Sequence, residues 1–199
     1  MKGMVTNMWA YESVFYQIYP MGFCGVPFEN DGVQRHEIKR VEDWIPHMQK
    51  LGVNAVYFSP VFESDTHGYN TRDYRKIDVR LGTNEDFKEV CDALHRAGIR
   101  VVLDGVFSHT GSDSRYFNRE GRYGEGGAYR DPNSPYRSWY DFDSKYKGGY
   151  RSWWGFETLP EVNEETPSYV EFITGEGGVI DTWLRRGAAG FRLDVADEL

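Results

Sequence analysis

Two stretches of the chain place a carboxylate a few residues from a basic side chain. Asp104 is followed five residues later by His109, and Arg192 is followed two residues later by Asp194. An arginine next to an aspartate keeps the carboxylate ionised and oriented, which suits a nucleophile or an electrostatic stabiliser. The pair also has a purely structural explanation, because buried arginine–aspartate pairs often serve the fold alone.

A third polar group lies in one short stretch that contains His67, Gly68, Tyr69 and Asp73. An imidazole and a phenol in one site can hydrogen-bond to a sugar ring and stack on its face. Taken alone, Tyr69 would be explained by packing, and His109 by an ordinary polar contact. A common location for these groups would favour a functional site over separate structural roles.

Four short apolar runs predict the strands that would position these groups. They are rich in β-branched and aromatic residues without polar alternation, a pattern typical of strands buried on both faces. The runs are residues 14–20, 55–60, 100–107 and 189–195. Because the side-chain period of a strand is two, Arg192 and Asp194 would lie on the same side of the last strand.

Helical patterns lie between these runs. The clearest covers residues 83–97, opens with a capping-box pattern and ends at Gly98. Residues 38–51, with Pro46 as a weak point, and residues 169–186, split by glycines, are also predicted as helices. Alternating strands and helices predict right-handed βαβ units and a parallel sheet. The carboxyl ends of parallel strands meet at one edge, so the three polar groups should converge there.

Residues 110–165 break this alternation. They are rich in Gly, Tyr, Trp, Arg and Asp and have no period, and an unstructured loop of this length is improbable in a compact domain. We therefore expect an ordered excursion or small subdomain. An RNA-binding tract is the alternative, but residues 105–166 carry 8 Lys and Arg against 10 Asp and Glu, the wrong balance for phosphate binding.

The overall charge argues against a nucleic-acid partner. The 199 residues carry 23 Lys and Arg and 31 Asp and Glu, a net charge of −8, whereas nucleic-acid binding depends on clustered basic residues. No stretch approaches the roughly 20 apolar residues of a membrane span, so we expect no membrane partner. The start of the chain has no signal-peptide pattern. We expect Cys24 and Cys91 to be reduced thiols in a cytoplasmic protein.

The sequence contains no clear metal or cofactor motif. Its five histidines show no metal-ligand spacing with one another or with cysteine. The acidic stretches 29–31 and 141–143 could contact calcium, but neither matches a calcium-binding loop. No glycine-rich phosphate-binding turn follows a predicted strand. We therefore predict no cofactor, and calcium has no clear motif in its support.

Four strand–helix units that finish with the fourth strand predict the N-terminal half of a (β/α)8 TIM barrel, a fold of about 250 residues or more. We divide the chain into barrel units over residues 1–107, an inserted small subdomain over 108–166, and the last helix with the fourth strand over 167–199. The first and fourth strands would each keep one open edge, and open edges favour self-association.

Four blocks of the sequence resemble the α-amylase family of glycoside hydrolases. They are HGYNTRDY, DGVFSH, LPEVN and GFRLDVADE, which begin at residues 67, 104, 159 and 190. VFYQIYP and GVNAVYFSP resemble the first two barrel strands of that family, so the likeness runs from about Ser13 to Leu199. VADE and LPEVN are most similar to the neopullulanase, cyclomaltodextrinase and maltogenic-amylase branch.

The resemblance implies a role for each matching residue. Asp194 would be the nucleophile of a retaining α-glucan hydrolase, and Arg192 would orient and stabilise it. Asp104 and His109 would belong to the subsite of the sugar that is cleaved, and Tyr69 would stack on that sugar. The implied substrates are starch-derived maltodextrins, cleaved at α-1,4 linkages, with α-1,6 linkages left open.

The same resemblance places Asp197 and Glu198 on the leaving-group side. Ser108 stands where many α-amylases have a calcium-binding Asn, so no calcium site is carried over. The family's general acid, a Glu after the fifth strand, and its third carboxylate would lie beyond Leu199. Retaining glycosidases need two carboxylates about 5–5.5 Å apart, so we expect the 199 residues alone to be inactive.

Two other readings of the family resemblance remain open. A transglycosylase or an α-glucosidase would use the same nucleophile, and the residues that select water or sugar as acceptor would lie on later loops. A non-catalytic relative that serves binding or assembly is the alternative from another class. The joint presence of Asp194, Arg192, His109 and Tyr69 argues against that relative, because a degenerate site needs none of them.

Overall fold

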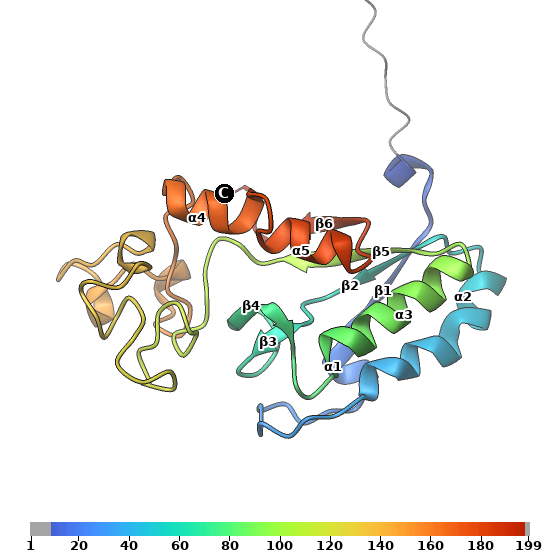
Figure 1. Cartoon of the computed structure of the whole chain (residues 1–199), viewed down its shortest axis with the longest axis horizontal. Helices are drawn as coiled ribbons and strands as arrows, with labels where there is room; N and C mark the ends of the chain where they lie inside the picture. Colours follow the sequence, from blue (N-terminus) through green and yellow to red (C-terminus); the bar gives the residue numbers. More distant parts are fainter. Residues whose placement is uncertain (1–8, 198–199) are drawn as a thin grey trace, which may run out of the picture.

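Four parallel strands form the central sheet of the computed structural model, which describes residues 9–197 (Figure 1). In spatial order they are β1 (Phe15–Ile18), β2 (Ala55–Phe58), β5 (Arg100–Gly105) and β6 (Gly190–Leu193). The register aligns Gln17 with Tyr57, Tyr57 with Val102, and Val102 with Gly190. Each strand lies within one of the predicted runs, and the predicted parallel order is confirmed.

Helices pack against one face of this sheet. Val56, Phe58, Val101 and Leu103 are fully buried in one apolar core that also contains Trp183. Burial of each such side chain contributes roughly 1.5–3 kcal/mol. The helical segments are α1 (Pro20–Phe23), η2 (Glu37–Trp44), α2 (Ile45–Lys50), α3 (Asn84–Arg96), α4 (Pro167–Thr174) and α5 (Val179–Arg185). A further segment, η1 (Trp9–Glu12), lies at the opposite face, where Trp9 contacts Phe15.

The start of α3 has the capping box that the sequence predicts. The Thr83 hydroxyl accepts a hydrogen bond from the Asp86 amide at 3.1 Å, and the Asp86 carboxylate accepts one from the Thr83 amide at 2.8 Å. The predicted helix over 38–51 is divided instead. Its first half is a 3-10 helix, and α2 starts at Ile45 with Pro46 in its first turn, where the missing proline N–H costs least.

The other face of the sheet lines a hollow of about 530 Å³. Phe15, Gln17, Tyr57, Val102 and Arg192 are among the residues that surround it, and Phe15 is 45% exposed. Among the described residues, the predicted burial on both faces holds for the central strands β2 and β5, apart from the partly buried Tyr57 and the exposed Arg100, and fails for the edge strands β1 and β6. Their uniform apolar runs mask a real alternation between side chains that face the helices and side chains that face the hollow.

An antiparallel hairpin that the sequence does not predict lies between β2 and α3. It consists of β3 (Phe62–Ser64) and β4 (Thr71–Ile77), and its polar composition hides it from a hydrophobic-pattern search. Arg80, just after β4, is fully buried and donates hydrogen bonds to both carboxylate oxygens of Asp78 at 2.8 Å. It also donates to the Phe28 and Thr66 carbonyls and so ties the hairpin to the preceding loop.

Residues 106–166 form a lobe at one end of the molecule, on the side where β5 ends (Figure 1). In this part of the described chain the regular elements are three short 3-10 helices: η3 (Arg137–Trp139), η4 (Lys147–Gly149) and η5 (Trp153–Gly155). Phe117, Tyr140 and Tyr150 are buried here and pack edge to face. The lobe is therefore held together by an aromatic core rather than by regular secondary structure. The boundaries of the inserted subdomain at residues 107/108 and 166/167 stay a prediction.

Two further features of the described residues concern the cysteines and the membrane. Cys24 and Cys91 are free and buried, and burial raises the pKa of each thiol to about 12. Within residues 9–197, no helix has the length and apolar composition to cross a bilayer.

We predict that Asp78→Ala lowers the free energy of unfolding by about 3–5 kcal/mol, because it leaves the buried Arg80 charge without its partner. Asp92→Ala is the matched control, since Asp92 forms an exposed pair with Lys88 on α3 and should cost at most about 0.5 kcal/mol. Urea unfolding of the protein that contains this chain checks both values. Equal losses in the two variants would contradict the importance of the buried pair.

Candidate active site

Arg192 joins two carboxylates at the carboxyl ends of β5 and β6. Its Nη1 atom donates to Asp194 Oδ1 at 2.5 Å and to Asp104 Oδ1 at 3.1 Å. Partial burial opposes the charged form, but the hydrogen bonds to Asp194 and Asp104 raise the pKa of the Arg192 guanidinium. One guanidinium therefore orients both aspartates, although they are 90 residues apart in the sequence.

The Asp104 carboxylate is the most enclosed member of this group. Its side chain is 0% exposed, and its Oδ2 atom accepts hydrogen bonds from the Tyr57 hydroxyl and, at 3.2 Å, from the Tyr69 hydroxyl. Burial raises the pKa of Asp104, although the bonds from Tyr57 and Arg192 act to lower it. With donors on both oxygens, Asp104 is suited to position its neighbours.

Burial, together with the charges of Asp104 and Asp194, raises the pKa of Tyr69 to about 12. The phenol is therefore a hydrogen-bond donor at neutral pH. Gly68 allows the turn that presents this ring: its φ is +101°, and a Cβ atom there would lie 2.8 Å from the Pro60 side chain. The Tyr69 amide also donates to His67 Nδ1 at 3.2 Å, and burial lowers the pKa of His67.

His109 is fixed by contacts to its ring and its backbone. Its Nε2 atom lies 3.1 Å from the Tyr69 carbonyl oxygen, and its Nδ1 atom lies 2.9 Å from the Ser108 hydroxyl. The buried Tyr74 hydroxyl donates to the carbonyl oxygens of His109 at 2.9 Å and Val106 at 2.7 Å. The unpredicted strand β4 thus holds the loop that carries His109.

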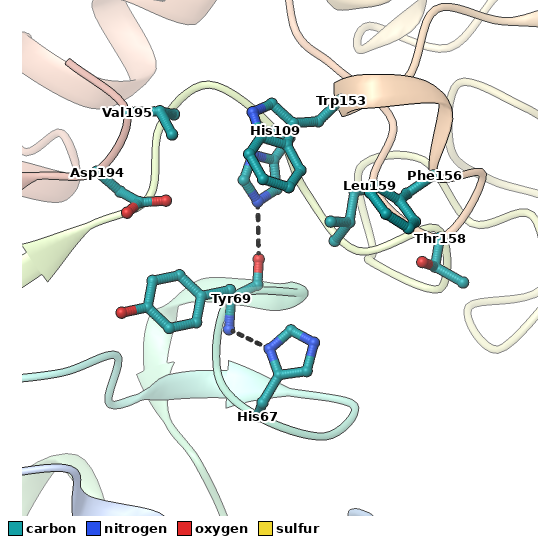
Figure 2. A pocket seen from close by; sticks show the side chains of 9 residues that line it. All are labelled: His67, Tyr69, His109, Trp153, Phe156, Thr158, Leu159, Asp194 and Val195. Carbon is teal, nitrogen blue, oxygen red and sulfur yellow. Dashed lines mark hydrogen bonds between the residues drawn. The ribbon is translucent and has the colours of Figure 1, made fainter. Parts of the chain in front are cut away.

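Asp194, Tyr69 and His109 line one pocket of about 440 Å³ (Figure 2). The Asp194 side chain is 14% exposed. Figure 2 shows Asp194 and Val195 on one side of the pocket, Phe156, Thr158 and Leu159 on the other, and His67 and Tyr69 between them. The pocket combines a carboxylate, imidazoles, a phenol and apolar rings, a lining suited to a polyhydroxylated ring substrate.

The segment that carries Asp194 differs from the prediction in one respect. β6 ends at Leu193, so Asp194 lies in the following turn, although its amide still donates to the Gly105 carbonyl at 3.1 Å. Val195 then has a φ of +41°. A β-branched residue in the left-handed region costs on the order of 1–3 kcal/mol, and such strain is concentrated at functional sites.

Some candidate site residues from the sequence analysis do not line this pocket. Asp73 pairs with Arg115 at 2.6 Å instead, and Asp197 is exposed in the turn after β6. Glu198 lies outside the described residues. The leaving-group role of Asp197 and Glu198 stays a prediction.

Sequence reasoning missed three aromatic residues at this site. Tyr57 lies on β2 and reaches across the hollow face to Asp104, a position that the period of two in the strand could have indicated. Trp153 and Phe156 come from the lobe, where no periodicity pointed to the pocket. Within residues 9–197, no group of three or more His, Cys, Asp or Glu side chains is placed to hold a metal ion.

A parallel βα sheet with its polar groups at the strand carboxyl ends is the arrangement of α/β enzymes, both barrels and open doubly wound sheets. Residues 17–199 match the catalytic domain of the alpha-amylase family, and the chain belongs to that family. The solved relatives are TIM-barrel enzymes, so the predicted first half of a (β/α)8 barrel is confirmed.

Among curated relatives, the chain is 32% identical to an amylopullulanase of Thermoanaerobacterium saccharolyticum, with 100% of this chain and 20% of that protein covered. It is 33% identical to neopullulanase 2 of Thermoactinomyces vulgaris, with 98% of this chain and 35% of that protein covered. The chain thus spans from a fifth to about a third of these relatives.

Two solved structures have similar folds over 96% of this chain. One is the cyclic α-maltosyl-(1→6)-maltose hydrolase of Arthrobacter globiformis, with 28% identity, a TM-score of 0.76 and 46% of that chain covered. The other is a debranching enzyme of Nostoc punctiforme, with 31% identity, a TM-score of 0.74 and 44% of that chain covered.

We predict that Tyr57→Phe lowers the free energy of unfolding by about 1–3 kcal/mol, because it removes a donor from the fully buried Asp104 carboxylate. Tyr16→Phe on the neighbouring strand β1 is the matched control, since Tyr16 packs on the opposite, helix-covered side. Chemical denaturation of both variants measures the difference. A loss for Tyr57→Phe no larger than that for Tyr16→Phe would contradict this role.

Proposed function

We propose that this chain supplies the nucleophile half of a retaining α-glucan hydrolase. The observation that carries the proposal is the Asp194 carboxylate, which lies at the pocket and is held by Arg192 at 2.5 Å. A carboxylate fixed in this way can attack the anomeric carbon of a bound sugar while the glycosidic C–O bond breaks and the leaving oxygen takes a proton from the general acid. Water then cleaves the covalent glycosyl–enzyme bond. His109 would bind a hydroxyl group of that sugar, and Tyr69 would stack on its face.

The general acid would come from outside these 199 residues. Retaining glycosidases hold two carboxylates about 5–5.5 Å apart, and Asp194 is the only carboxylate among the described residues that line the pocket. Glu161, a candidate within the chain, pairs with Arg151 in a different pocket of the lobe. The two halves of the catalytic pair would therefore meet when the barrel is complete.

The relatives support starch-derived maltodextrins as substrates. They are named amylopullulanase, neopullulanase, cyclomaltodextrinase and oligo-1,6-glucosidase. We propose cleavage of α-1,4 linkages, and the name oligo-1,6-glucosidase keeps α-1,6 linkages open. A transglycosylase or an α-glucosidase with the same nucleophile is the second candidate. The ordered Arg192–Asp194–Asp104 group argues against a non-catalytic relative, because binding alone needs no oriented nucleophile.

In the complete enzyme, we predict that Asp194→Asn lowers kcat on maltotriose on the order of 10⁴-fold or more while leaving oligosaccharide binding measurable. The neutral amide cannot form the glycosyl–enzyme bond, and the loss falls on the transition state rather than on uniform binding. Steady-state kinetics and calorimetric titration separate the two effects. Asp92→Asn, the same change at an exposed pair on α3, is the control and should leave kcat unchanged. A loss of kcat of tenfold or less in Asp194→Asn would show that Asp194 is not the nucleophile.

A second prediction concerns Tyr69. Tyr69→Ala should weaken maltooligosaccharide binding more than Tyr69→Phe, because the ring face is proposed to meet the sugar. Tyr69→Phe removes the hydroxyl that donates to Asp104 and should act mainly on kcat through Arg192 and Asp194. Calorimetry gives the two dissociation constants, and equal losses of affinity would show that the ring face is not the binding surface.

A further inference from the structure

His109 has a specific contact at each of its two ring nitrogens. Its Nε2 atom lies 3.1 Å from the Tyr69 carbonyl oxygen, and its Nδ1 atom lies 2.9 Å from the Ser108 hydroxyl. A carbonyl oxygen accepts hydrogen bonds and cannot donate them, so Nε2 must carry a proton. A hydroxyl can do either. If the Ser108 hydroxyl donates, Nδ1 carries no proton and the ring is neutral.

The surroundings of Ser108 favour donation to the ring. Ser108 and His109 are each 2% exposed, so this chain itself buries the contact between them. The Ser108 carbonyl oxygen accepts a hydrogen bond from the Val162 amide at 2.9 Å, which fixes its backbone against the lobe. A buried hydroxyl needs an acceptor for its proton, and the lone pair of Nδ1 is within reach. The Ser108 hydroxyl is therefore the donor of this bond.

The two edges of the His109 ring face different parts of the structure. Among the described residues, His109 and Tyr69 line the pocket that contains Asp194, and Ser108 does not. Figure 2 shows the Nε2 atom directed toward the Tyr69 carbonyl oxygen. The Nδ1 edge is turned toward the buried Ser108. A ligand in the pocket therefore meets the edge that carries the Nε2 proton.

We propose that Ser108 is a positioning residue that donates to His109 Nδ1 and so holds the imidazole as the neutral tautomer with its proton on Nε2. This inference rests on the proposed function, because that tautomer offers a bound sugar oxygen a donor of fixed direction. The partner of one ring nitrogen sets the tautomer in the same way for metal-binding histidines. Without the Ser108 hydroxyl, Nδ1 loses its donor, and the ring is no longer held to one tautomer and one orientation.

The first test detects the tautomer directly and needs no substrate. In the complete protein that contains this chain, labelled with ¹⁵N-histidine, nitrogen chemical shifts distinguish protonated from unprotonated ring nitrogens. The His109 signals, assigned by their absence in His109→Gln, should show a protonated Nε2 and an unprotonated Nδ1 at neutral pH. Ser108→Ala should abolish this pattern, and Ser108→Thr, which keeps the hydroxyl, should retain it. Two protonated nitrogens in the wild type, or an unchanged pattern in Ser108→Ala, would overturn the inference.

The second test is kinetic. Ser108→Ala should lower kcat/KM on maltotriose roughly three- to tenfold, the range of one hydrogen bond, and Ser108→Thr should restore it to within about twofold. In the His109→Gln background, Ser108→Ala should change kcat/KM by less than about twofold, because Ser108 acts through the ring. Ser114→Ala is the matched control and should leave kcat/KM unchanged, because the buried Ser114 hydroxyl accepts from the Phe117 amide at 3.1 Å within the lobe.

The two tests separate this inference from the proposed function. If maltotriose is cleaved but kcat/KM is unchanged in Ser108→Ala, or falls equally in Ser108→Ala and Ser114→Ala, Ser108 has no positioning role and the hydrolase proposal stands. A full further loss on adding Ser108→Ala to His109→Gln would likewise identify a structural role and overturn the inference. If no α-glucan is cleaved but the His109 tautomer still depends on the Ser108 hydroxyl, the positioning role stands and the hydrolase proposal fails.

Discussion

The bond between Arg192 and Asp104 is the interaction on which the site depends. It joins neighbouring strands β5 and β6 at their carboxyl ends, and the same Nη1 atom then reaches Asp194. Asp104 can bind Arg192 in this way because Tyr57 and Tyr69 satisfy its other oxygen. A buried carboxylate is tolerated only when its hydrogen-bonding capacity is filled. The Tyr57 and Tyr69 hydroxyls therefore allow Asp104 to hold Arg192, and Arg192 in turn fixes the geometry of Asp194.

Buried phenols perform a similar task for the loop after β5. Tyr74 from β4 and Tyr169 from α4 donate to backbone carbonyls between residues 106 and 109, and Trp183 of α5 in turn donates to the Tyr74 carbonyl. A loop buried under a lobe must find partners for its backbone groups. Here, side chains from β4 and α4 supply them, and Trp183 of α5 holds the backbone of β4 at Tyr74, so the high aromatic content serves both packing and loop positioning.

The sequence predicted the parts that follow from periodicity and capping. The four parallel strands, the α3 capping box and the meeting of Tyr69, His109, Arg192 and Asp194 at one edge all follow from local patterns and the geometry of parallel sheets. The β3–β4 hairpin was missed because it is stabilised by buried polar groups such as Arg80 and Asp78 rather than by apolar alternation. Trp153 and Phe156 were missed because only tertiary packing brings the lobe to the pocket, and no local pattern encodes that contact.

Two aspartates share one guanidinium here, yet their surroundings suit them to different tasks. Asp104 has a side chain with no exposed surface and donors on both oxygens, so it has no free face for a ligand and acts through Arg192. Asp194 receives the same arginine on Oδ1 and borders the pocket, which leaves its carboxylate available to a substrate. Environment rather than residue type separates positioning from reacting groups in carboxylate sites.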